Sequence, residues 1–209
     1  MRSIIVVFST VLVFMAVIYF ANLGVENKSQ ADTQSVTVSA SVQTAMTFST
    51  TTGGTAAFGS LTPGSPIASP ATGTVLSVTT NAANGYTIGV SDAKTSTNSA
   101  LLHTDATTYI ADYAGTIATP TSWTGTGLGL TLFAADTTKE SAWGTGTAYD
   151  DANNKYAGIP QNATTAHTVT GYHSGADTSS WAFKLDVPGT QKTGTYSGTV
   201  TFTATAVLS

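Results

Sequence analysis

The chain has 209 residues and no cysteine, its formal net charge is −4, and charged residues make up 9% of it. Average globular proteins carry about 25% charged residues, so the polarity of this chain comes from hydroxyl groups and glycine instead. The small number of Lys and Arg residues argues against a nucleic-acid partner, which requires a basic surface. Without disulfides the fold must be held by its core, and a chain of this length buries enough apolar surface for that.

The first segment indicates export. Arg2 precedes an apolar run from Ile4 to Ala21, the pattern of a secretory signal. Small residues before Asp32 suit cleavage after Ala31. The alternative is an uncut membrane anchor, because about 20 apolar residues span a bilayer.

Both alternatives predict an extracellular or cell-surface protein. Residues 1–31 would form the signal peptide or anchor, and residues 32–209 a single domain. The membrane would be contacted only through residues 1–21, if these are not removed.

The first strand of the domain is predicted over Gln34 to Phe48. Its apolar residues alternate with polar ones and fall on one face, as Val36, Val38, Ala40, Val42, Met46 and Phe48. This alternation is typical of a half-buried strand. Two roles remain open: the strand pairs within its own sheet, or it is donated to another copy as an assembly strand.

The next stretch, Ser49 to Thr74, predicts a long connection with an edge segment around Phe58. Its prolines, Pro70 among them, remove backbone donors and argue against a central strand. Val75–Thr80 and Tyr86–Val90 then predict a hairpin, because Asn-Gly is a strong turn signal.

The remaining elements are short. Ser99–His103 predicts one helical turn, and strands are expected around Leu130, over Thr168–Tyr172 and over Trp181–Val187. The closing stretch, Gly194–Val207, alternates strictly, with its apolar face formed by Tyr196, Val200, Phe202, Ala204 and Ala206. The chain therefore predicts an all-β fold, an antiparallel β-sandwich of about seven to nine strands, preceded by one N-terminal hydrophobic helix.

Several of these segments carry a resemblance to known proteins. Trp143-Gly144, Tyr156–Pro160, the Trp181–Val187 strand and the closing GTYSGTVTFTAT resemble exported surface proteins of candidate-phylum bacteria, which are related to Gram-positive β-sandwich surface proteins. The TTNAANGYTIGV stretch of the expected hairpin resembles the same class. The resemblance implies an exported sandwich and brings no catalytic residues. The architecture is also similar to that of secreted filament subunits.

Candidate metal ligands are few. His167 and His173 are six residues apart, with Asp177 as the nearest third ligand, but the spacing matches no metal motif. We expect the histidines to face solvent. Asp150, Asp151, Asn153 and Asn154 form an oxygen-rich loop that lacks calcium-loop spacing, so it is interpreted as a solvated turn, with a calcium site as the alternative.

Two tryptophans lie in loops rich in Gly and Thr. Trp123 and Trp143 either close the end of the sandwich or stack on sugar rings, whereas the alternation around Trp181 predicts a core position.

No motif in the sequence predicts a catalytic residue, a metal or a cofactor. The sequence thus predicts a non-enzymatic extracellular or cell-surface structural protein, a filament or surface-layer subunit that self-associates through strand edges. The alternative is a surface adhesin or polysaccharide-binding module that uses the loop aromatics.

Overall fold

The computed structural model describes residues 34–92, 99–173 and 175–208. The predicted signal peptide or anchor of residues 1–31 lies outside these residues. None of the helical structure they contain is long and apolar enough to cross a membrane. Residues 1–41 and residues 42–209 are separate units, and the fold described here is that of the second.

The all-β prediction is confirmed, with twelve strands and one short 3-10 helix in the described residues. The elements are β1 (Met46–Thr52), β2 (Ile67–Thr80), β3 (Tyr86–Asp92), β4 (Ser99–His103), β5 (Tyr109–Ala111), β6 (Thr121–Ser122), β7 (Gly127–Ala135), η1 (Ser141–Trp143), β8 (Lys155–Tyr156), β9 (Thr164–Val169), β10 (Asp177–Asp186), β11 (Tyr196–Ser197) and β12 (Val200–Ala206).

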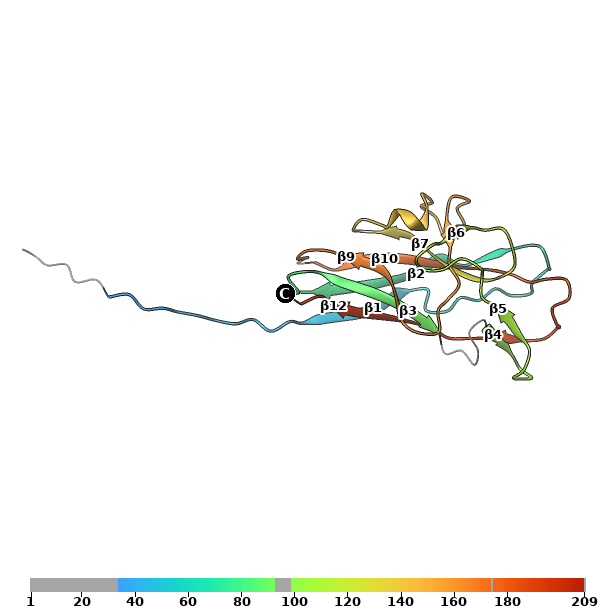
Figure 1. Ribbon diagram of the computed structural model, residues 1–209, viewed down its shortest axis with the longest axis horizontal. Coiled ribbons are helices and arrows are strands. Elements are labelled where there is room, and N and C mark those ends of the chain that lie inside the picture. The colour runs from blue at the N-terminus through green and yellow to red at the C-terminus, as the bar shows by residue number, and fades with distance from the viewer. Residues whose placement is uncertain (1–33, 93–98, 174, 209) are drawn as a thin grey trace, which may run out of the picture. The chain divides into compact units, whose positions relative to one another are not determined.

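The strands form two main antiparallel sheets and two small ones (Figure 1). The larger main sheet has the order β1-β2-β10-β7, and the other has the order β12-β3-β9. The two main sheets pack face to face in a sandwich-like arrangement, since the ring of Trp181 on β10 lies 5.3 Å from that of Phe202 on β12. The small sheets are β11-β4-β5 and β6-β8.

The core lies between the main sheets, and the apolar residues at every second position of the strands point into it. In β3, buried residues alternate with partly exposed ones along the whole strand. In β7, by contrast, both faces are buried, and even Thr131 has no exposed surface. Trp181 is also fully buried, which confirms the core position predicted for it.

The predicted hairpin of Val75–Thr80 with Tyr86–Val90 is wrong. Both segments are strands, but β2 pairs with β1 and β10, whereas β3 pairs with β12 and β9. The Asn81–Gly85 connection carries the chain from one sheet to the other. Each strand has one apolar face, and crossing between sheets buries both faces against each other, which a flat hairpin would not do.

The connection expected over Ser49 to Thr74 is shorter than predicted, because β2 begins at Ile67 and Pro70 lies within it. At Pro70 itself β2 is not a central strand, since β1 pairs only with Val75–Thr80 and the ladder to β10 skips Pro70. The β10–β2 register shifts between Trp181 and Phe183, so residues between Ser69 and Thr74 bulge out of the ladder. A bulge tolerates proline because the ladder hydrogen bond is already missing there.

The first strand is shorter than predicted, since β1 begins at Met46 and residues 34–45 belong to no strand. Met46 pairs with Thr80, the last residue of β2. Beyond that point β2 offers no further residues, and extended chain needs a partner to become a strand.

Other boundaries also changed. Ser99–His103 is strand β4 rather than a helical turn, and the strand expected at Thr168–Tyr172 is Thr164–Val169. The closing stretch is divided into β11, which pairs with β4, and β12, which pairs with β3. The predicted alternation of β12 is present, but its inward residues are half-buried rather than fully buried.

Candidate functional site

The outer edge of β7, which is the edge that does not pair with β10, is covered along its length by backbone and side-chain contacts. Leu130 exchanges two backbone hydrogen bonds with Ala157, at 2.7 and 2.9 Å. The carbonyl of Leu128 accepts from the N–H of Tyr113 at 2.9 Å. Lys139 Nζ donates to the carbonyl of Phe133 at 3.3 Å, and burial lowers the pKa of this ammonium group. No further strand can pair with β7 while these contacts persist.

The free edge of β9 is covered by side chains that follow β7. Glu140 Oε1 accepts from the backbone N–H of Thr168 at 2.7 Å, and Trp143 Nε1 donates to the carbonyl of Ala166 at 3.0 Å. His167 Nδ1 lies 2.9 Å from Glu140 Oε2. Burial acts to raise the pKa of Glu140, but the hydrogen bonds from His167 and Thr168 outweigh it, so the pKa lies below its usual value.

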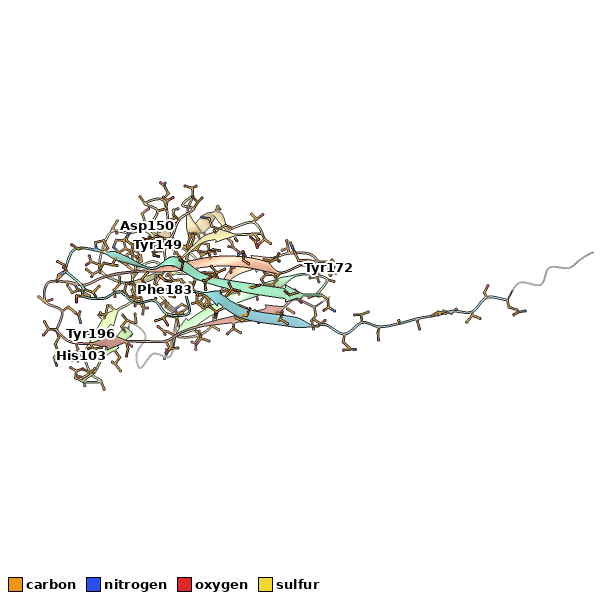
Figure 2. The ribbon with its side chains drawn as sticks, turned by 180° about the vertical axis from the view of Figure 1, so that it is seen from behind. His103, Tyr149, Asp150, Tyr172, Phe183 and Tyr196 are labelled. Atoms are coloured by element: carbon orange, nitrogen blue, oxygen red, sulfur yellow. The ribbon has the colours of Figure 1, made fainter. Side chains whose placement is uncertain are left out.

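These contacts fix which edges lie together. Because the segment after β7 covers β9, the β7 and β9 edges share one side of the sandwich. In both main sheets the opposite edge strand is then on the other side, and these two strands are β1 and β12. They run along the same margin of the domain in both views (Figure 1, Figure 2).

The β1 and β12 edges have no such cover among the described residues. Beyond the ladders to β2 and β3, no backbone group of Met46–Thr52 or Val200–Ala206 has a side-chain or loop partner there. Neither strand contains a charged residue or a proline. Natural proteins usually protect exposed edges with such residues, because an unpaired edge attracts another strand.

The inner faces of these two strands are also incompletely covered. Met46 and Phe48 on β1, and Val200, Phe202 and Ala204 on β12, pack against the core but remain partly exposed. On the neighbouring strands, the inward residues are almost fully buried. The side chains of the core are therefore fully buried on the β7–β9 side and partly exposed to solvent on the β1–β12 side.

The residues that precede β1 carry exposed apolar side chains. Val36, Val38 and Val42 are 84%, 87% and 86% exposed, and Ala40 in the same phase is also exposed. The structure thus divides the six residues of the predicted assembly strand. Met46 and Phe48 are in β1, whereas the other four lie outside every strand.

The two loop tryptophans have different surroundings. Trp143 is 1% exposed and lies edge-on to Trp181 at 5.8 Å, which favours the packing role. Trp123 is half-buried: Tyr113 stacks on its ring at 4.4 Å, and Lys184 Nζ lies 5.6 Å from its centroid. Burial lowers the pKa of Lys184. The rings of Trp123 are therefore largely engaged with other side chains of the domain.

The prediction that His167 and His173 face solvent is wrong for His167. His167 is 1% exposed, bonds to Glu140 and lies 3.4 Å from Thr137 Oγ1 through its other nitrogen. His103 is also buried, and the centroid of its ring lies 4.9 Å from that of Tyr196. The two side chains are labelled in Figure 2. Both buried histidines have intramolecular partners, which offset the cost of removing a polar imidazole from water.

The candidate metal residues have separate contacts. His173 Nδ1 lies 3.4 Å from Asp177 Oδ2, while His167 bonds to Glu140. Among the described residues, no three potential ligands of the His, Cys, Asp or Glu type come together.

In the oxygen-rich loop, the Asp151 carboxylate accepts backbone N–H groups of Thr147 and Asn153, which lowers its pKa. Asn154, predicted to lie in a solvated turn, is instead 1% exposed, and its Nδ2 donates to the carbonyl of Ala148. Asp150 is exposed beside Tyr149 (Figure 2).

Sequence reasoning missed Glu140. It lies in a polar stretch between β7 and η1, and nothing local distinguishes it from a surface carboxylate. Its role depends on β9, 28 residues away. The only signal in the sequence was its neighbour Trp143, whose size predicts burial and hence a folded-back loop.

Comparisons with models of known protein families, with curated proteins and with solved structures find no match.

Proposed function

We propose that this chain is a non-enzymatic structural protein of the cell surface or extracellular space, which self-associates through its strand edges. One observation carries the proposal: the β7 and β9 edges are covered, whereas the β1 and β12 edges are uncovered, uncharged and partly exposed on their inner faces. A free edge offers a row of backbone donors and acceptors to a second chain.

The composition supports close approach of many copies. With charged residues at 9% of the chain and a net charge of −4, electrostatic repulsion between copies is small. The outward residues of β12 are threonines, exposed at Thr201, Thr203 and Thr205. Their hydroxyl groups keep this face soluble, and their branched Cβ atoms favour extended backbone, so the strand keeps its shape before and after association.

The polysaccharide-binding alternative has less support. Of its two stacking residues, Trp143 has no exposed ring face, and Trp123 already packs against Tyr113.

The proposal is tested by following assembly of the purified full chain with light scattering and negative-stain electron microscopy over a range of concentrations. We expect filaments or sheets above a threshold concentration. Thr203→Lys places a charge on the open β12 edge and should suppress assembly. Thr165→Lys is the matched control, because Thr165 is exposed on β9, whose edge is already covered. A wild-type chain that stays monomeric at every concentration would overturn the proposal.

A further inference from the structure

The sandwich has one strand fewer in one main sheet than in the other. The β1-β2-β10-β7 sheet has four strands and the β12-β3-β9 sheet has three. The segment that follows β7 bonds to the outer edge of β9, from which we infer that the two sheets are aligned on that side. No described strand of the three-stranded sheet therefore lies opposite β1. This accounts for the partial exposure of Met46 and Phe48, while Leu76 and Val78 on β2 are each 1% exposed.

The backbone of β12 is oriented to receive a strand at this position. Val207 N–H donates to the carbonyl of Gly85 at 2.9 Å, which sets the phase of the β12–β3 ladder. In an antiparallel ladder, alternate residues bond to the partner and the others point away. The backbone N–H and C=O groups of odd-numbered residues such as Thr203 therefore bond to β3. Those of Phe202 and Ala204 point the other way, toward the open edge.

Residues 34–45, the N-terminal arm, have the length and pattern of the absent strand. Val36 to Val42 covers seven residues, as β12 does, with apolar side chains at alternate positions and Ser or Thr between them. Paired beside β12, the arm would direct its valines toward Met46 and Phe48 and its hydroxyls toward water, in the same alternation as β12 itself.

The arm of the same chain is poorly suited to fill this position. Asn81 accepts from the N–H of Ala45 at 2.6 Å and donates to the carbonyl of Gln43 at 2.9 Å, so the last residues of the arm are held in line with β1. A return to β12 would need a reverse turn before Gln43. Residues 34–45 contain no Gly, Pro, Asn or Asp, and serine is the one turn-favouring residue type among them.

We propose that the open edge of β12 accepts the N-terminal arm of a second copy of this chain, with Val36, Val38 and Val42 packing over Met46 and Phe48. This inference rests on the proposed function and specifies its contact. The donor and the acceptor are different surfaces of the same chain, so each copy donates to one neighbour and accepts from another. Such head-to-tail contacts do not close on themselves, and they produce a filament.

The test uses two variants of the full chain that each disable one partner of the contact. Val36→Thr/Val38→Thr/Val42→Thr keeps the shape of the arm but removes its apolar face, leaving an acceptor without a donor. Ala204→Pro removes an N–H that points away from β3, leaving a donor without an acceptor, and an edge strand tolerates proline at such a position. Thr37→Ser/Ser39→Thr/Ser41→Thr changes only the polar face of the arm and is the control.

Each disabled variant should keep the melting temperature of the wild-type monomer and should fail to form filaments. For the triple-threonine arm, we expect the critical concentration to rise roughly a hundredfold or more, from three lost apolar contacts. Mixing the two variants should restore one contact and give a discrete 1:1 dimer by analytical ultracentrifugation. If Ala204→Pro lowers the melting temperature, Thr203→Lys replaces it as the donor-only variant, because it leaves the backbone unchanged.

The possible failures are distinguishable. If the wild type forms filaments and both variants also form them, the arm and the β12 edge are not the contact, and the inference falls while the proposed function stands. If both variants lose assembly but their mixture stays monomeric, the two surfaces do not bind each other, and the inference is again wrong. A wild type that never assembles would overturn the proposed function and the inference together.

Discussion

Truncation of Trp143 separates a packing role from a sugar-binding role. Its indole is 1% exposed, lies edge-on to Trp181 and donates to the carbonyl of Ala166. Replacing a buried large aromatic residue by alanine costs about 3–5 kcal/mol, and the bonded carbonyl left without its donor accounts for roughly 1 kcal/mol of such a loss. At about 2–4 °C per kcal/mol for a domain of this size, Trp143→Ala should lower the melting temperature by roughly 6–20 °C.

The assay is thermal unfolding followed by circular dichroism, with polysaccharide pull-down measured on the same preparations. Trp143→Phe keeps most of the ring and should cause a smaller loss, mainly that of the hydrogen bond. Tyr172→Ala is the control, since Tyr172 is 62% exposed and its truncation should change stability by no more than about 0.5 kcal/mol. An unchanged melting temperature in Trp143→Ala, together with lost pull-down, would refute the packing role.

Three further predictions concern pH, the closing strand and calcium. The pKa of Glu140 in the folded protein is below its usual value of 4.5, so the ionised carboxylate stabilises the fold fully above pH 4.5 and less as the pH falls toward the lower folded-state pKa. The difference in unfolding free energy between wild type and Glu140→Gln should therefore be smaller at about pH 3 than at about pH 7. An equal difference at the two pH values would contradict this prediction. Phe202→Ala should cost about 1.5–2.5 kcal/mol in denaturant titrations of the monomer, half the value for a fully buried ring, whereas Thr201→Ala should cost under about 0.5 kcal/mol; equal losses would mean that the phase of β12 is wrong. Millimolar calcium should leave the melting temperature unchanged, because the Asp151 carboxylate already accepts backbone N–H groups, and a rise of several degrees would indicate a calcium site.

The strands themselves were largely predictable from the sequence. Alternation located β3, β10 and β12 with the correct inward faces, because an apolar residue at every second position has only one face to bury. Sheet membership was not predictable in the same way. The Asn84-Gly85 signal is compatible with a hairpin and with a crossing between sheets, and only the packing of the two apolar faces decides between them.

The candidate site was predictable in part. The valines of the arm and their phase can be read directly from residues 34–45. The acceptor edge cannot, because it is defined by which edges remain uncovered. That depends on contacts distant in sequence, such as the bond of Glu140 to Thr168 that covers β9. Glu140 also bonds to His167, which explains why this histidine is buried although it looks like a surface histidine in the sequence.

Hydrogen exchange at two backbone amides tests the central claim most directly. The N–H groups of Phe202 and Ala204 point away from β3, so in the monomer they face the open edge, whereas that of Thr203 is bonded within the ladder. If the arm of a second copy pairs with β12, the amides of Phe202 and Ala204 should become strongly protected on assembly, and that of Thr203 should change much less. Exchange of Phe202 and Ala204 at the same rate in assembled and monomeric protein would contradict the account.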